Sequence, residues 1–184
     1  MRIIGGKLKG KKIFFLDSNI TRPLRDLVKE SIFNIINHSN LIPVNLENSN
    51  ILDLYSGIGS FGIECISRGA KEITFVENDV NAIQILKKNL HTLKLEDRTY
   101  LYTSQISSSI KKINNNFDVI FLDPPFVDHN YKEILAQIKE REIFKKKHII
   151  ILHRDAANKD ELDKIITTIL TKKYGRSKII FGVF

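Results

Sequence analysis

The segment Asp123-Pro124-Pro125-Phe126 could do the most specific chemistry in this sequence, and it follows an apolar run at residues 119–122. A carboxylate oxygen of Asp123 and the backbone carbonyl after Pro124 could accept hydrogen bonds from the two N–H groups of an exocyclic amine, which would orient its lone pair. Because prolines have no N–H group, that carbonyl meets no competing donor. Phe126 offers a flat surface for a stacked nucleobase, typically worth about 1–3 kcal/mol. The motif therefore predicts group transfer to an amino nitrogen of a nucleobase.

A glycine-rich loop at residues 57–62 forms a second candidate site, with the spacing Gly-x-Gly-x-x-Gly. With Glu77 about twenty residues later, the spacing fits a nicotinamide dinucleotide site. Glu77 does not discriminate between cofactors that contain a ribose, because its oxygens could accept hydrogen bonds from the ribose hydroxyls of any of them. Asp53, however, would repel a pyrophosphate but could hold the ammonium group of a methionine moiety. Hydride transfer also has no evident use for the Asp123 motif, so S-adenosylmethionine is the favoured cofactor.

The elements that must position these residues begin near Asn50, where short apolar runs start to alternate with helical stretches, as in a parallel sheet covered on both faces. We expect strands at residues 51–55, 73–77, 100–103, 119–123 and 148–153, helices at 61–68, 80–95, 107–114 and 131–141, and an antiparallel hairpin at 165–184. Ligands collect at the carboxyl ends of such strands, where the strand order reverses. With the order 3-2-1-4-5, the glycine loop and Asp123 would face one cleft.

The N-terminal part of the chain predicts a basic extension at residues 1–49 before a main domain at 50–184. Residues 1–15 predict short strands joined by a tight turn, and a helix follows with Thr21 as its cap and Pro23 in its first turn. Its expected apolar face comprises Leu27, Val28, Ile32, Ile35 and Ile36, with Arg22, Arg25 and Lys29 largely off that face.

The charge distribution points to a polyanionic partner. The net charge is +8 with a pI of about 9.5, and residues 1–30 hold eight basic side chains against three acids. A solvated basic surface is the alternative. The single cysteine, Cys65, excludes an internal disulfide and a cysteine-cluster metal site, so we expect a cytoplasmic protein. The sequence shows neither a signal peptide nor an apolar run long enough to span a bilayer, and we expect no membrane partner.

Several segments together resemble the RsmD family of bacterial class I methyltransferases, which act on guanine N2 (guanine-966 type) in 16S rRNA. They are residues 2–12, 21–34, 52–59, 67–70, 123–126 and 174–175, with the N-terminal block the most specific. The resemblance implies an α/β, Rossmann-like fold with a mostly parallel seven-stranded sheet in the order 3-2-1-4-5-7-6 and helices on both faces. It also implies S-adenosyl-L-methionine as cofactor, no metal, a monomer, and a substrate in the small ribosomal subunit or its assembly intermediate.

The resemblance assigns roles to individual residues. The base site comprises Asp123, Pro124, Pro125 and Phe126; the cofactor site Asp53, Tyr55, Gly57, Gly59, Glu77, Asn78 and Gln105; the RNA surface Lys7, Lys9, Lys11, Lys12, Arg22, Arg25 and Lys29. One position departs from the family, which usually places an Asp after the third strand to contact the adenine of the cofactor. Gln105 could still hydrogen-bond an adenine edge through its amide, so we expect retained but weaker binding.

Two alternatives stay open from the sequence. An adenine-N6 methyltransferase acting on DNA or RNA would need the same base site, because the motif at residues 123–126 does not separate the two bases. A nucleic-acid-binding protein that keeps the fold without turnover is the second alternative.

Overall fold

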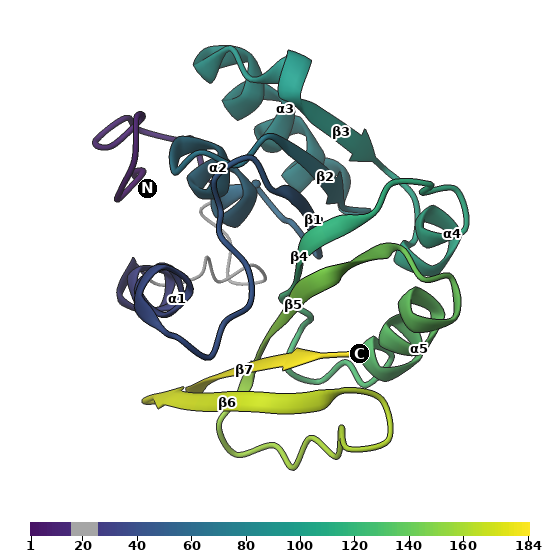
Figure 1. Ribbon diagram of the computed structural model, residues 1–184. Coiled ribbons are helices and arrows are strands. Elements are labelled where there is room, and N and C mark those ends of the chain that lie inside the picture. Colours follow the sequence, from purple (N-terminus) through teal and green to yellow (C-terminus); the bar gives the residue numbers. More distant parts are fainter. Residues whose placement is uncertain (16–25) are drawn as a thin grey trace.

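A computed structural model describes residues 1–15 and 26–184 and shows one seven-stranded sheet flanked by helices (Figure 1). The strands are β1 (Asn50–Leu54), β2 (Glu72–Val76), β3 (Thr99–Tyr102), β4 (Phe117–Leu122), β5 (Phe144–Asp155), β6 (Thr167–Tyr174) and β7 (Ser177–Val183). Their order, β3-β2-β1-β4-β5-β7-β6, confirms the expected topology. The first five strands pair in parallel, whereas β7 pairs antiparallel with both β5 and β6.

Helices cover both faces of the sheet (Figure 1). They are α1 (Asp26–His38), α2 (Ser60–Ser67), α3 (Val80–Leu93), α4 (Ile106–Ile110) and α5 (Tyr131–Glu140), with a short 3-10 turn at Glu96–Arg98. Successive side chains of a strand point to opposite faces. In β4, Val119 and Phe121 pack with α1, α2 and α3, while Ile120 and Leu122 pack with α4 and α5. None of the helices in the described parts of the chain is long and apolar enough to span a membrane.

Two elements of the main domain differ in length from the expectation. Strand β5 begins at Phe144 rather than at residue 148, because Phe144 pairs with Phe117 and the Lys145 ammonium lies 2.7 Å from an Asp118 carboxylate oxygen. Helix α4 ends at Ile110, before the run Asn114–Asn116. Asn side chains compete with helical hydrogen bonds, which explains the early end.

Residues 1–15 do not form the expected pair of strands. They form a short antiparallel hairpin with one isolated bridge, between Arg2 and Lys12, and backbone hydrogen bonds from Ile3 N to Lys11 O and from Ile13 N to Met1 O, each 3.0 Å long. The backbone N–H groups of Ile4 and Gly5 also donate to the Glu64 carboxylate of α2, at 2.9 and 2.7 Å. Glu64 is fully buried, so contacts with α2 hold the segment in addition to the hydrogen bonds of its own short hairpin.

Helix α1 buries three of the five residues of the expected apolar face and adds Lys29 and Phe33 to them. Its buried residues are Val28, Lys29, Ile32, Phe33 and Ile36, whereas Leu27 is 68% exposed. The Lys29 side chain is inaccessible, and its ammonium lies 3.6 Å from Asp26 and 4.0 Å from Glu64. The expectation that Lys29 faces solvent or a ligand is therefore wrong, because these carboxylates hold its charge inside the protein.

The predicted boundary at residue 49 does not divide the hydrophobic core. Residues from both sides of it, including Ile3, Phe33 and Phe121, belong to one buried cluster. The expected helix start, with Thr21, Arg22, Pro23 and Arg25, lies outside the described residues.

Candidate active site

The glycine loop joins β1 to α2 and contains several left-handed backbone conformations. Tyr55, Gly57 and Gly59 have φ values of 56°, 53° and 81°. A Cβ atom at Gly59 would lie 2.3 Å from Leu86 Cδ1, so only glycine fits there. At Gly57 an added Cβ would meet nothing within 4 Å. The space over Gly57 is thus open to a ligand that approaches the backbone.

Asp53, in β1, lies beneath the loop and is only 1% exposed. Its Oδ2 accepts a hydrogen bond from Gly62 N at 3.0 Å, while Oδ1 is buried without a partner among the described residues. Burial raises the pKa of the Asp53 carboxyl well above its usual value; Gly62 N opposes the shift, and the charges of Asp123 and Glu77 add to it. A cationic ligand group at Oδ1 would relieve this unfavourable burial. The site therefore fits the ammonium group of S-adenosylmethionine.

Glu77 follows β2 and ties its end to the glycine loop. Its Oε2 accepts a hydrogen bond from Gly57 N at 2.7 Å, and its Oε1 accepts from Asn78 N and Asp79 N, each at 2.8 Å. An ionised carboxylate offers about four acceptor positions. Glu77 therefore keeps capacity for a ribose hydroxyl while it orders the loop.

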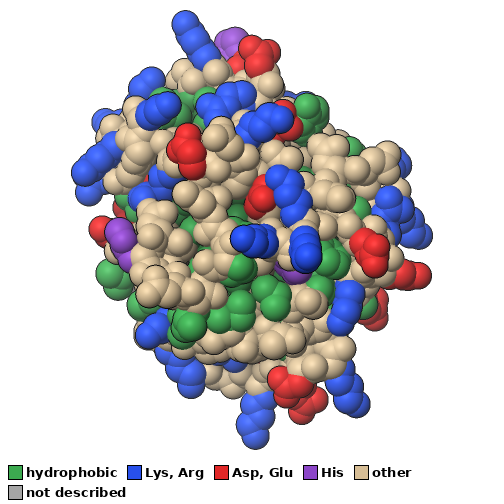
Figure 2. Space-filling model, in the orientation of Figure 1, with side chains coloured by type: hydrophobic (Ala, Val, Ile, Leu, Met, Phe, Trp, Pro, Cys, Tyr) green, Lys and Arg blue, Asp and Glu red, His purple; other side chains and the backbone are tan. Residues whose placement is uncertain are grey.

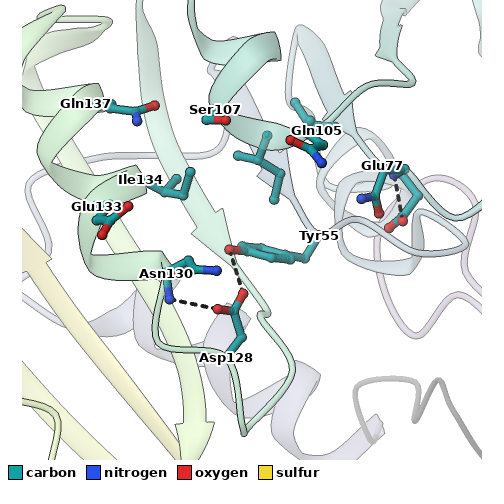
Figure 3. A pocket seen from close by; sticks show the side chains of 12 residues that line it. Tyr55, Glu77, Gln105, Ser107, Asp128, Asn130, Glu133, Ile134 and Gln137 are labelled. Carbon is teal, nitrogen blue, oxygen red and sulfur yellow. Dashed lines mark hydrogen bonds between the residues drawn. The ribbon is translucent and has the colours of Figure 1, made fainter.

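A cavity of about 390 Å³ opens beside Glu77 (Figure 3). It is lined by Tyr55, Val76, Glu77, Asn78, Gln105, Ile106, Ser107, Asp128, Asn130, Glu133, Ile134 and Gln137. In Figure 3, the side chains from α5 lie opposite Glu77 and Gln105, with Tyr55 between them. The Tyr55 hydroxyl donates to Asp128 Oδ2 at 3.2 Å, which joins the β1 end to the loop after β4.

The cavity brings together four of the seven predicted cofactor residues: Tyr55, Glu77, Asn78 and Gln105. Asp53, Gly57 and Gly59 do not line it. The sequence did not predict that residues of α5 would line one side of the cavity. No motif marks these residues, and Glu133 and Gln137 reach the cavity only because α5 packs beside α4.

Asp123 lies directly after β4, and its backbone N–H donates to Leu54 O of β1 at 3.4 Å. This contact places the base motif next to the glycine loop. Asp123 Oδ1 lies 2.7 Å from His153 Nδ1, and His153 Nε2 lies 2.9 Å from Ser177 Oγ. The Phe126 ring meets the His153 ring edge to face, with centroids 5.3 Å apart.

Sequence reasoning missed His153 and Ser177 as site residues. The position of His153 could have indicated its role, because it is the last residue of the expected strand at residues 148–153. That strand ends next to the fourth strand, at the edge of the sheet where ligands bind. Ser177 carries no such signal, since it reaches the site through the antiparallel pairing of β7 with β5.

Arg154 holds the loop that carries the base motif. Its side chain is fully buried and donates to Pro125 O at 3.1 Å and to Phe126 O at 3.0 Å. A second donor to Phe126 O is Asn158 Nδ2, at 3.1 Å. Among the described residues, the Pro124 carbonyl accepts no hydrogen bond. The loop thus has fixed carbonyls at residues 125 and 126 and an available acceptor at Pro124.

A buried ion-pair network in turn holds Arg154. Its Nε donates to Asp160 Oδ1 at 3.1 Å, and Asp160 also accepts from the Tyr131 hydroxyl and lies 2.8 Å from the Lys178 ammonium. The Arg154 guanidinium lies 4.3 Å from the centre of the Tyr131 ring. These contacts join α5, β5 and β7 behind the base motif.

The basic residues of the N-terminal segment lie at the surface. Lys7, Lys9, Lys11 and Lys12 are all exposed. In Figure 2, blue Lys and Arg side chains are spread over the visible face with few red acidic groups between them. Phe14 is 42% exposed and stacks under the Lys88 ammonium, 3.8 Å from the ring centre. This surface combines cations with an accessible aromatic ring, as nucleic-acid-binding surfaces do.

Comparison with known proteins identifies the relatives of the chain. Residues 1–183 match a family model described as conserved hypothetical protein 95. A relative from Haemophilus influenzae, named ribosomal RNA small subunit methyltransferase D, is 37% identical over 158 residues, covering 84% of this chain and 79% of the relative. A relative of the same name from Buchnera aphidicola subsp. Baizongia pistaciae is 30% identical over 188 residues, covering 100% of this chain and 91% of the relative.

The fold comparison agrees with these relatives. The solved structure of yhhF from Escherichia coli superimposes with a TM-score of 0.84 and 25% identity, covering 99% of this chain and 96% of that chain. A solved structure from Haemophilus influenzae gives a TM-score of 0.77 with 30% identity, covering 98% of this chain and 96% of that one. The class I methyltransferase fold expected from the sequence is confirmed. Because the family model and these relatives extend over most of the chain, the protein belongs to the RsmD family.

Proposed function

We propose that this protein transfers a methyl group from S-adenosylmethionine to the exocyclic N2 of a guanine in 16S rRNA of the small ribosomal subunit. The observation that carries the proposal is the placement of Asp123 beside the glycine loop, with the Pro124 carbonyl left as an available acceptor. Membership of the RsmD family supports an rRNA substrate, because the relatives described above are named as small-subunit rRNA methyltransferases.

The methyl donor is S-adenosylmethionine, which supplies an electrophilic methyl group when bound. Asp53 Oδ1 would accept a hydrogen bond from its ammonium group, and Glu77 would accept one from a ribose hydroxyl. Gln105 lines the same cavity and contacts the adenine edge in place of the acid usual in the family. Asp53 fits this ligand because its buried Oδ1 has no hydrogen-bond partner among the described residues. Gly57 fits it because the space above its backbone is open.

The base motif orients the nucleophile. The Asp123 carboxylate and the Pro124 carbonyl accept the two N–H groups of the amine, so that its lone pair points toward the methyl donor. Phe126 stacks on the base, which must leave its helix or loop to enter the site. No strong general base is needed, since the proton leaves after the nitrogen has become cationic. The motif itself would also accept an adenine N6 amine.

The N-terminal basic segment binds the RNA backbone in this proposal. Lys7, Lys9, Lys11 and Lys12 contact phosphates, and Arg22 and Arg25 are assigned the same role from the sequence. Contacts of this kind release counterions, so binding weakens as salt rises. Replacing Lys11 and Lys12 by Ala should flatten the dependence of RNA affinity on salt and leave cofactor affinity unchanged. The matched control replaces Lys146 and Lys147, an exposed pair on β5; equal salt slopes for the two variants would contradict the assignment.

The decisive experiment compares the wild-type protein with Asp123→Ala in transfer of a radiolabelled methyl group to small ribosomal subunits that lack the modification. We expect the variant to lose transfer while it still binds S-adenosylmethionine. Nucleoside mass spectrometry of the labelled RNA should show N2-methylguanosine. Full activity of Asp123→Ala would refute the assigned site. Detection of N6-methyladenosine in the labelled RNA would show that the target base is adenine rather than guanine.

A further inference from the structure

We propose that His153 is a positioning residue that orients the Asp123 carboxylate, and that Ser177 selects the imidazole tautomer this role requires. The inference rests on the proposed function, in which Asp123 accepts a hydrogen bond from the substrate amine. Neither residue belongs to the sequence motifs. The geometry consists of two short contacts in series, from Asp123 Oδ1 to His153 Nδ1 at 2.7 Å and from His153 Nε2 to Ser177 Oγ at 2.9 Å.

The chemistry of the three groups determines the direction of the hydrogen bonds. An ionised carboxylate only accepts hydrogen bonds, so His153 Nδ1 must carry the proton that it shares with Asp123. In the neutral ring Nε2 is then an acceptor, and the Ser177 hydroxyl is the donor within reach. With Oδ1 occupied by His153, Oδ2 of Asp123 remains for the substrate amine. The contact between Asp123 and His153 thus leaves one carboxylate oxygen bonded to the protein and the other available to the base.

Asp123 needs such a partner because its surroundings are acidic. The buried Asp53 carboxylate is close enough for its charge to interact with that of Asp123, and the Asp123 side chain is 23% exposed. Among the described residues, the hydrogen bond with His153 is the one that holds the Asp123 carboxylate, so it fixes the rotation of that group. A displacement of about 1 Å at a reacting group can cost about a hundredfold in rate.

His153 is itself held in place from several directions. It is 8% exposed, it lies opposite Ile179 in the β5–β7 pairing, and the Phe126 ring packs against it edge to face. Ser177 begins β7 and lies opposite Asp155. The imidazole therefore connects three neighbouring strands at the edge where the base motif lies, and it cannot turn without disturbing the Phe126 ring.

A second histidine of the same strand provides a matched control. His148 is 5% exposed in β5; its Nδ1 lies 2.8 Å from Lys145 O, and its Nε2 accepts from Phe184 N at 3.0 Å. It has the same pattern of two ring contacts but touches no residue of the base motif. Replacing His148 reports the general effect of removing a buried histidine from β5.

The experiment measures methyl transfer to small ribosomal subunits by His153→Ala, His153→Asn, His153→Gln and His148→Ala. For His153→Ala we expect kcat to fall about tenfold to a hundredfold, with KM for RNA and Kd for S-adenosylmethionine within about twofold of wild type. His153→Asn should recover most of this loss, because its amide N–H can occupy the position of Nδ1. His153→Gln should not recover it, since its amide reaches the position of Nε2, and His148→Ala should keep kcat.

A double mutant tests whether His153 acts through Asp123. Adding His153→Ala to Asp123→Ala should not lower the residual kcat of the single variant any further, because the two residues act as a unit. Wild-type kcat in His153→Ala, equal rates for the folded Asn and Gln variants, or a loss confined to KM for RNA would each overturn the inference. Activity that survives Asp123→Ala would refute the proposed site itself, whereas an inactive Asp123→Ala with a fully active His153→Ala refutes only the role of His153.

Discussion

Replacement of Arg154 by Ala should reduce both the stability of the protein and its rate of methyl transfer. The substitution removes three hydrogen bonds from a fully buried charged donor, to Asp160 and to the carbonyls of Pro125 and Phe126. Removing one partner of a buried ion pair typically costs about 3–5 kcal/mol. Asp160 keeps the Lys178 ammonium at 2.8 Å, so we expect the lower end of this range, about 3 kcal/mol.

Urea unfolding at 25 °C measures the change in free energy directly. A loss of about 3 kcal/mol leaves a domain of ordinary stability, about 5–15 kcal/mol, folded under assay conditions. Methyl transfer can therefore be measured on the same variant, and kcat should fall because the carbonyls of residues 125 and 126 lose the buried guanidinium and keep only the donors Asp128 N and Asn158 Nδ2. The matched control is Arg176→Ala, which removes an arginine side chain that is 74% exposed and lies 3.4 Å from Asp155. A destabilisation by Arg154→Ala no larger than that of Arg176→Ala, with unchanged kcat, would show that the buried guanidinium does not hold the base loop.

Three further predictions concern the core and the pH dependence of stability. Gly62→Ala should destabilise the protein by about 1–3 kcal/mol in urea unfolding, because the new Cβ would lie 2.4 Å from Phe75 Cε1; an unchanged midpoint would contradict this. Burial raises the pKa of the Cys65 thiol well above its usual value, so a thiol reagent at neutral pH should react only after unfolding. Although burial opposes it, hydrogen bonds from Lys178, Tyr131 and Arg154 hold the pKa of Asp160 below its usual value. This stabilisation is present above the unfolded-state pKa of about 3.9 and is lost as pH falls through the folded-state pKa, so the acid decrease in unfolding free energy should be smaller in Asp160→Asn.

Local sequence patterns are enough to establish the class of fold and the two halves of the site. The alternation of apolar runs and helical stretches predicted the parallel strands and the terminal hairpin, because both patterns are properties of local sequence. The glycine spacing at residues 57–62 and the motif at 123–126 each indicated a ligand-binding turn for the same reason. Their placement at one edge of the sheet followed from the rule that parallel strands end at the same edge, and the strand order confirms that β1 and β4, which precede them, are neighbours.

Which polar side chains lie in the site and which lie in the core depends on the packing of the whole chain. Lys29 has the spacing of a surface residue on α1, yet it is buried because Asp26 and Glu64 neutralise it there. His153 and Arg154 are consecutive in β5 and therefore point to opposite faces, where one meets Asp123 and the other the carbonyls of the base loop. Their roles depend on the register between β4, β5 and β7, which joins residues more than 20 positions apart in the chain. Such pairings are non-local, so no window of the sequence contains them.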